Sequence, residues 1–134
     1  MIRIPKAVRD RKAALEAELG EPVTISGIAG SMGLFQRVHG HRHSIDDAIT
    51  AWYALTKRPR AKRVLDLGAG IGTVGLALLH GLGPRATMTC IEAQNASFRI
   101  LRANLRCNDL SERVTAIHGD LRDVDLGRVF DLVT

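Results

Sequence analysis

The sequence has few cysteines and aromatic residues and no long apolar run. Its 134 residues include two cysteines, Cys90 and Cys107, which give neither a disulfide framework nor a metal-binding spacing. No stretch of about eighteen apolar residues occurs, so we expect no membrane-spanning helix and no membrane partner. The charged first residues are not followed by the apolar segment of a signal peptide. These absences favour a reducing, cytoplasmic setting.

Charge is distributed unevenly along the chain. Aromatic residues make up 4% of the sequence and apolar residues 46%, which is enough apolar material for one small domain or part of a larger one. Residues 1–63 contain 12 lysines and arginines against 6 acids, whereas residues 64–134 contain 7 against 8. The basic N-terminal region would suit a polyanion such as RNA. A solvated basic surface with no such partner remains the alternative.

A glycine-rich stretch follows the first strongly apolar run. Residues 64–67 are typical of a buried parallel strand, and residues 73–79 are typical of an apolar helix. The glycines between them permit a sharp bend and allow a ligand to lie against the backbone. Because a helix start presents unpaired N–H groups, this strand, turn and helix predict a nucleotide-binding unit.

Three acids follow successive apolar strands. Asp66 precedes the first glycine by two residues, Glu92 ends the strand over residues 86–91, and Asp120 follows the strand over residues 114–118. Glu92 has the spacing at which a carboxylate binds ribose hydroxyls. Gly70, Gly72 and Gly75 also fit the dinucleotide fingerprint, so a nicotinamide or flavin cofactor remains open. Asp66 disfavours it, because a carboxylate there would repel a pyrophosphate and would suit an ammonium group.

The pattern Asp66-x-Gly68-x-Gly70-x-Gly72 resembles motif I of the class I S-adenosylmethionine-dependent methyltransferases. This resemblance implies that S-adenosylmethionine is the cofactor and that its ammonium group meets Asp66. It implies that Gly68, Gly70 and Gly72 admit the methionine moiety. In the same family Glu92 would bind the ribose, Ala93 would flank the adenine, and Asp120 would hold the adenine amino group.

A second resemblance lies just before motif I. Residues 40–46 are similar to the segment of bacterial tRNA adenine-N6 methyltransferases in which a Phe-Ser-x-Asp stretch caps a helix close to the methyl donor. It makes Ser44 and Asp46 candidates for the cofactor pocket, although His43 stands where the family has an aromatic residue. Ser44 and the acids after it also suit a helix start without any ligand.

The chain is predicted to fold as an α/β domain, a partial Rossmann-like class I methyltransferase sheet. We expect an N-terminal unit over residues 1–63 and a cofactor-binding half over residues 64–134. The first contains a helix over 5–19, a hairpin with strands at 22–28 and 34–38, and a helix from Ser44. The core-facing residues of that last helix are expected to be Ile45, Ala48, Ile49, Trp52 and Leu55. The second unit supplies four parallel strands, at 64–67, 86–91, 114–118 and 129–134. It also supplies a helix at 73–79, ended by Gly81 and the Gly83-Pro84 pair, and a helix at 95–108.

Three histidines alternate along one short segment. His39, His41 and His43 would share a face of an extended chain, which raises the possibility of a metal site. No cysteine nearby completes a tetrahedral set, so we expect no metal and interpret the segment as a basic loop.

The predicted function is N-methylation of an exocyclic base amine, adenine N6, in tRNA or another RNA. In the resembled family, an Asn/Asp-Pro-Pro-Tyr/Phe motif that binds the target amine follows the segment matching residues 131–134, and this sequence contains none. We therefore expect the chain to hold the cofactor half of the domain and assign no catalytic residue. Protein glutamine-N5 or guanine-N2 methylation, an NAD(P)-dependent oxidoreductase and a non-catalytic RNA-binding module remain open.

Overall fold

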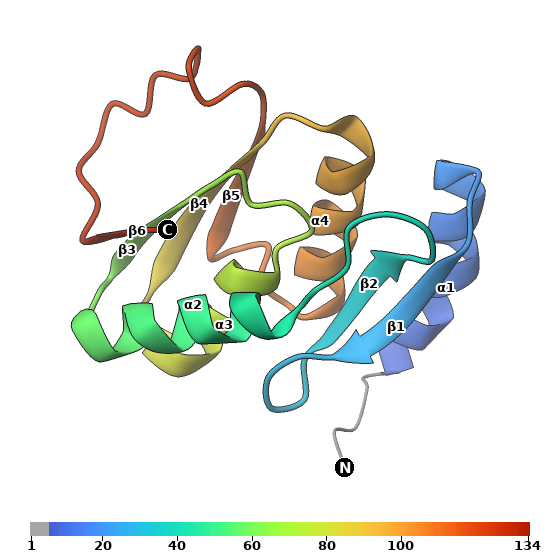
Figure 1. Ribbon diagram of the computed structural model, residues 1–134, viewed down its shortest axis with the longest axis horizontal. Helices are drawn as coiled ribbons and strands as arrows, with labels where there is room; N and C mark the ends of the chain where they lie inside the picture. Colours follow the sequence, from blue (N-terminus) through green and yellow to red (C-terminus); the bar gives the residue numbers. More distant parts are fainter. Residues whose placement is uncertain (1–5) are drawn as a thin grey trace.

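The computed structural model describes residues 6–134 (Figure 1). Pro5, where the first helix was predicted to begin, lies outside the described residues. The elements in chain order are α1 (Lys6–Leu19), β1 (Val23–Gly27), β2 (Gly33–Arg37), α2 (Ile45–Lys57), β3 (Arg63–Leu67), α3 (Thr73–Leu82), β4 (Thr87–Glu92), α4 (Asn95–Cys107), β5 (Val114–His118) and β6 (Leu132–Val133).

The main sheet has four parallel strands in the order β5-β4-β3-β6. The chain therefore runs from β3 outward through β4 to β5, and then returns to place β6 on the other side of β3. This reversal of direction beside β3 is the point at which open α/β sheets bind ligands, outside the carboxyl ends of their strands. The predicted α/β sheet of four parallel strands is confirmed.

Helices α3 and α4 form the two crossovers of this sheet. Parallel crossovers are right-handed, so two consecutive crossovers in the same direction lie on one face, and α3 and α4 both pack against the strands. The connection from β5 to β6, residues 119–131, contains no helix and runs as the long red loop of Figure 1.

The N-terminal unit packs against α4 through two asparagines. Asn104 is fully buried; its Oδ1 accepts a hydrogen bond from the Phe35 N–H, and its Nδ2 donates to the carbonyls of Phe35 and Ile71. One turn later, Asn108 accepts from the Gly33 N–H and donates to the Gly33 carbonyl. The side-chain amides of Asn104 and Asn108 thus make hydrogen bonds along the β2 edge of the β1–β2 hairpin. The predicted antiparallel hairpin is confirmed.

The predicted core face of α2 was wrong for Ile45, Ala48, Ile49 and Trp52, which are exposed, whereas Leu55 is partly buried and packs on the core as predicted. Ile45, Ile49 and Trp52 are 71%, 52% and 63% exposed, whereas Ala51 and Ala54 are buried against α3. At 100° per residue, the exposed stripe of Ile45, Ile49 and Trp52 lies about 155° around the helix from Ala51 and Ala54. The apolar pattern showed which residues of α2 share a face, but the position of α3 determined which face of the helix is buried.

Two boundaries also differ from the predictions. Helix α3 passes through Gly81 and continues to Leu82, and Gly83, the other residue predicted to end it, caps it at a φ of 81°. A Cβ on Gly81 would lie 2.5 Å from Leu55 Cδ1, so this glycine permits the close approach of α2 and α3. The fourth strand was predicted from Val129 but pairs as β6 over Leu132–Val133.

Candidate functional site

The glycine turn between β3 and α3 contains two kinds of glycine. Gly68 and Gly70 have φ values of 66° and 58°, and a Cβ built on either would meet no atom within 4 Å. Gly72 instead faces α4, where a Cβ would lie 2.7 Å from Leu101, and Gly75 faces Met88 at 2.7 Å. The first pair leaves the backbone open to a ligand, and the second pair allows α3 and the turn before it to pack closely against α4 and β4.

Glu92 holds the turn against the end of β4. Its Oε2 accepts a hydrogen bond from the Gly70 N–H at 2.7 Å, and its Oε1 accepts from the Gln94 N–H at 2.7 Å. The Ala69 N–H also donates to the Ile91 carbonyl, so turn and strand are joined twice. An ionised carboxylate has about four acceptor positions, so Glu92 retains acceptors for hydroxyl groups of a bound sugar.

Asp66 lies beneath the same turn and is 5% exposed. Its Oδ1 accepts a hydrogen bond from the Thr134 hydroxyl at 3.4 Å, while the buried Oδ2 has no partner in hydrogen-bonding geometry within residues 6–134. Burial raises the pKa of Asp66 to about 6, and the carboxylates of Asp47 and Glu92 add to the increase. The Thr134 hydroxyl and the nearby Gly75 N–H oppose this change in pKa without cancelling it. A buried carboxylate of this kind would be stabilised by a bound cation.

Asp120 lies at the same end of the sheet but is bound by its neighbour. The preceding Gly119 N–H donates to the Glu92 carbonyl, which places the start of the 119–131 loop beside β4. Arg122 donates to Asp120 from its backbone N–H and its guanidinium, and these hydrogen bonds lower the pKa of the Asp120 carboxyl. The structure thus brings Asp66 and Glu92 together at the turn, whereas the Asp120 carboxylate is occupied by Arg122.

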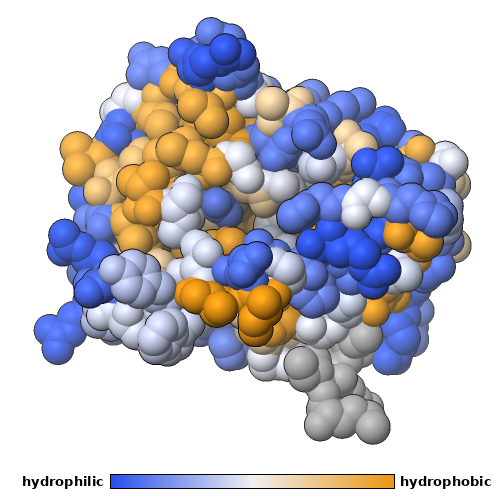
Figure 2. All heavy atoms as spheres, in the orientation of Figure 1, coloured by the Kyte–Doolittle hydropathy of each residue, from blue (hydrophilic) through white to orange (hydrophobic). Residues whose placement is uncertain are grey.

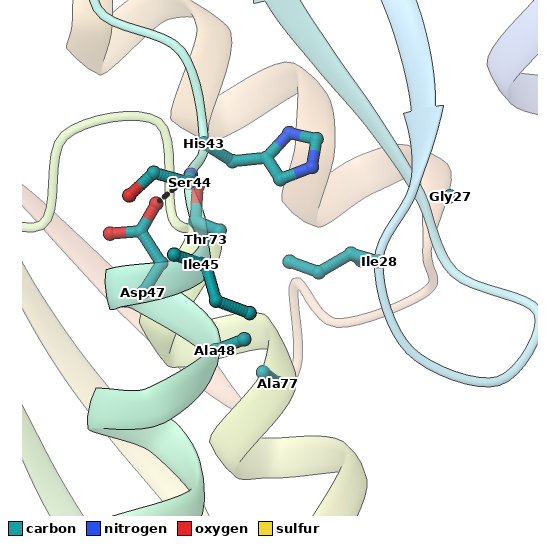
Figure 3. A pocket seen from close by; sticks show the side chains of 9 residues that line it. All are labelled: Gly27, Ile28, His43, Ser44, Ile45, Asp47, Ala48, Thr73 and Ala77. Carbon is teal, nitrogen blue, oxygen red and sulfur yellow. Dashed lines mark hydrogen bonds between the residues drawn. The ribbon is translucent and has the colours of Figure 1, made fainter.

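Ser44 lines a cavity of about 310 Å³ beside the turn (Figure 3). The cavity lies between the hairpin and the first turns of α2 and α3, and Thr73, the residue after Gly72, forms part of its wall. Asp47 accepts a hydrogen bond from the Ser44 N–H at 2.9 Å, as in one half of a capping box. Asp46, the predicted candidate, is exposed and does not line this cavity, whereas Asp47 does.

His43 connects this cavity to the hairpin. Its backbone N–H and its Nδ1 both lie 3.1 Å from Oε1 of Gln36, which is 1% exposed. Gln36 Nε2 in turn donates to the Ser26 hydroxyl. An Nδ1–H donor would leave Nε2 as an acceptor, and Figure 3 shows the ring lying across the cavity from Asp47.

Several residues at this end were not found from the sequence. The Phe98 and His118 rings stack with centroids 4.8 Å apart, and His118 Nε2 lies 3.1 Å from the carbonyl of exposed Ala93. Thr134 and Asp47 reach the surroundings of Asp66 from distant parts of the chain. No local pattern marks these residues, because each is brought there by a different element.

Across residues 6–134, no group of three His, Cys, Asp or Glu side chains is arranged to hold a metal ion. None of the helices described is both long and apolar enough to cross a membrane.

Residues 53–134 match the family described as the TRM5/TYW2 methyltransferase domain. The matched region contains β3, the glycine turn, Glu92 and Asp120. The chain belongs to the TRM5/TYW2 methyltransferase domain family. This membership confirms the predicted class, an S-adenosylmethionine-dependent methyltransferase domain, and its Rossmann-like fold.

Two solved structures and one curated relative are similar to this chain. TYW2 of M. jannaschii, solved with AdoMet, has a TM-score of 0.68 and 26% identity over 84% of this chain and 50% of its own. The N-terminal domain of EvdMO1, solved with SAH and D-fucose, has a TM-score of 0.68 and 25% identity over 93% and 51%. The tRNA1(Val) (adenine(37)-N6)-methyltransferase of Shewanella putrefaciens is 31% identical over 74 residues, 55% of this chain and 29% of its own. The chain therefore spans about half the length of these solved relatives and less of the curated one.

Proposed function

We propose that the protein containing this chain transfers a methyl group from S-adenosylmethionine to an exocyclic amine of a tRNA base, with adenine N6 as the target. The observation that carries this proposal is the open Gly68–Gly70 backbone beside Glu92 and above the buried, unpartnered Asp66 oxygen. The TRM5/TYW2 assignment and the tRNA-modifying relative support the substrate class.

The residues present fit this cofactor. Asp66 would stabilise the methionine ammonium group electrostatically, since its carboxylate is buried and its Oδ2 has no hydrogen-bond partner within residues 6–134. Gly68 and Gly70 would allow the methionine moiety to approach the backbone. Glu92 would accept hydrogen bonds from the ribose hydroxyls, and Asp120 would bind the adenine amino group after exchanging one of its bonds to Arg122.

When bound, S-adenosylmethionine supplies the electrophilic methyl group on its sulfonium. The contribution of this chain is then to orient the donor for in-line attack and to exclude water from it. The target base would have to leave its stack to reach the donor. Thr134 contacts Asp66, so the end of β6 lies beside the proposed donor site, and we assign no catalytic residue within this chain.

Calorimetric titration of the chain with S-adenosylhomocysteine and, separately, with NADH tests the proposed cofactor. We expect S-adenosylhomocysteine to bind and NADH not to bind. Glu92→Gln should weaken binding by at least about tenfold, since it removes a charged acceptor for two hydroxyl groups. Glu112→Gln, the same change on an exposed glutamate, is the matched control. Preferential binding of NADH would instead indicate an oxidoreductase.

Methylation of a synthetic tRNA by the full-length protein tests the substrate. We expect the product base to be N6-methyladenine, identified by mass spectrometry of the nucleosides. Methylation of guanine N2, or of a protein glutamine, would contradict the adenine assignment but leave the cofactor assignment unchanged. RNA binding with no binding of S-adenosylhomocysteine would support the non-catalytic alternative.

A further inference from the structure

The exposed face of α4 carries a row of arginines. Arg99, Arg102 and Arg106 are all exposed, and their spacing of three and four residues places them on one side of the helix. Helix α4 contains no acidic residue. At 1.5 Å per residue the row extends over about 10 Å.

A hollow lies on each side of this row. Arg11 of α1 and Glu18 line one, of about 270 Å³, together with Arg99, Arg102 and Arg106. Arg102 and Arg106 also line the other, of about 250 Å³, which continues toward β5. A phosphate in either hollow would therefore be within reach of the same two guanidinium groups.

Little negative charge neutralises the row. Arg99 donates to the Glu18 carbonyl, and the Glu18 carboxylate lies 4.0 Å from Arg11. Within residues 6–134, neither Arg102 nor Arg106 makes a hydrogen bond or an ion pair. Two exposed guanidinium groups without partners, side by side on a rigid helix, suit bidentate binding of phosphate.

The other basic segment of the chain is less suited to this role. The run from Lys57 to Arg63 precedes β3 and so lies at the opposite end of the sheet from the glycine turn. Asp131 accepts hydrogen bonds from the N–H groups of Lys62 and Arg63, and the Lys57 ammonium lies 5.1 Å from the Tyr53 ring. Helix α4 begins three residues after Glu92, at the same end as the turn, and runs toward the opposite end of the sheet. Arg99 therefore lies nearest the turn, whereas Arg102 and Arg106 line a hollow with Val114 at the start of β5.

We infer that Arg99, Arg102 and Arg106, with Arg11 across the groove, form a binding surface for the phosphate backbone of the RNA substrate. This α1–α4 surface deepens the proposed function and rests on it for the identity of the RNA. Its contacts are to phosphates, so it orients the RNA and contributes affinity without reading its sequence. The sequence predicted an RNA-binding surface on the basic N-terminal region alone. We place it instead between α1 of that region and α4.

Fluorescence anisotropy with unfractionated tRNA tests the surface. Arg102→Glu/Arg106→Glu should weaken binding by at least about tenfold and reduce the slope of log K against log salt by about 1.4 to 1.8, from two lost phosphate contacts. Arg102→Gln/Arg106→Gln, which adds no acid to the last turn of α4, should change both quantities in the same direction. The matched control Arg58→Glu/Arg60→Glu makes an equal charge change in the other basic segment and should weaken binding less than threefold.

Equal losses from the two pairs would overturn the inference, because they would show a diffuse electrostatic attraction. Unchanged tRNA binding in the Arg102/Arg106 variants, or equally tight binding of polyglutamate, would also overturn it. Titration of the same variants with S-adenosylhomocysteine separates this result from the proposed function. If the α1–α4 surface binds only RNA, these variants should bind S-adenosylhomocysteine with unchanged affinity. Absence of S-adenosylhomocysteine binding in every variant would contradict only the methyltransferase proposal.

Discussion

Helices α2 and α4 are both thirteen residues long, yet they distribute polar and apolar residues in opposite ways. Helix α4 buries the amide of Asn104 and exposes arginines, while α2 exposes Ile49 and Trp52 and buries Ala51. Figure 2 shows that hydrophobic residues are exposed on the visible face of the molecule. The difference shows that polarity alone does not decide whether a side chain is buried. A polar side chain can be buried where neighbouring elements supply its hydrogen-bond partners, and an apolar one stays exposed where no element packs against it.

Removing the Asn104 side chain should lower the free energy of unfolding more than the other substitutions considered, because it tests the buried polar group of α4. Asn104→Ala would leave the Phe35 N–H and the carbonyls of Phe35 and Ile71 buried without their partner. We expect a loss of about 3–5 kcal/mol in the free energy of unfolding, measured with urea. Asn95→Ala, on the exposed first turn of α4, should cost far less. A loss below 1 kcal/mol for Asn104→Ala would show that the hairpin does not depend on this amide.

The carboxylate of Asp66 lies where the two regions meet, since Asp47 of α2 and Glu92 before α4 both raise its pKa. Its folded-state pKa of about 6 exceeds the ordinary value of 3.8, so the folded chain holds the proton more tightly. The stability gained from this proton is present below pH 4 and is lost as the pH rises through about 6. Asp66→Asn should therefore stabilise the chain by up to about 3 kcal/mol at pH 8 and by little at pH 3.5.

Urea unfolding across this pH range measures the difference between Asp66→Asn and the original chain. The exposed Asp125 offers a control, and Asp125→Asn should give a difference that varies little with pH. A difference for Asp66→Asn that stays constant from pH 3.5 to 8 would contradict the burial of this carboxylate. The same variant should bind S-adenosylhomocysteine more weakly, which would make Asp66 a site where function lowers stability.

A paired substitution in α2 sharpens the comparison further. Ala51→Leu should cost about 1–3 kcal/mol because it inserts atoms between α2 and α3. Ile49→Ser should change the free energy of unfolding by less than about 0.5 kcal/mol, because the side chain is 52% exposed. The reverse order of costs would mean that the face predicted from the apolar pattern is the buried one.

The smallest perturbation uses the single tryptophan of the sequence. Trp52 is 63% exposed, so its fluorescence should be quenched by acrylamide in the folded chain nearly as strongly as after unfolding in urea. Strong protection from quenching in the folded monomer would indicate that the exposed α2 stripe is covered. Protection that appears only as the protein concentration rises would indicate that the stripe mediates self-association.

Much of the fold could be predicted because its signals are local. The strand at residues 114–118 was predicted with the bounds of β5, and the helix at 95–108 is longer than α4 by one residue. Asp66 and Glu92 were expected to meet, since the carboxyl ends of neighbouring parallel strands lie together, and the structure places both at the turn. The roles assigned to these residues, and to Ser44, Asp46, Ala93 and Asp120, remain predictions.

The sequence by itself determined the glycine turn between β3 and α3. An apolar strand, the glycines and an apolar helix follow one another in one short segment, where backbone conformation depends on nearby residues. Only the tertiary structure decided which glycines remain open, since Gly72 and Gly75 are closed off by Leu101 and Met88 from other elements. It likewise decided that Asn104 is buried and that Ile49 is exposed. The physical reason is that packing depends on which surfaces meet across space, and periodicity within one segment carries no information about the partner.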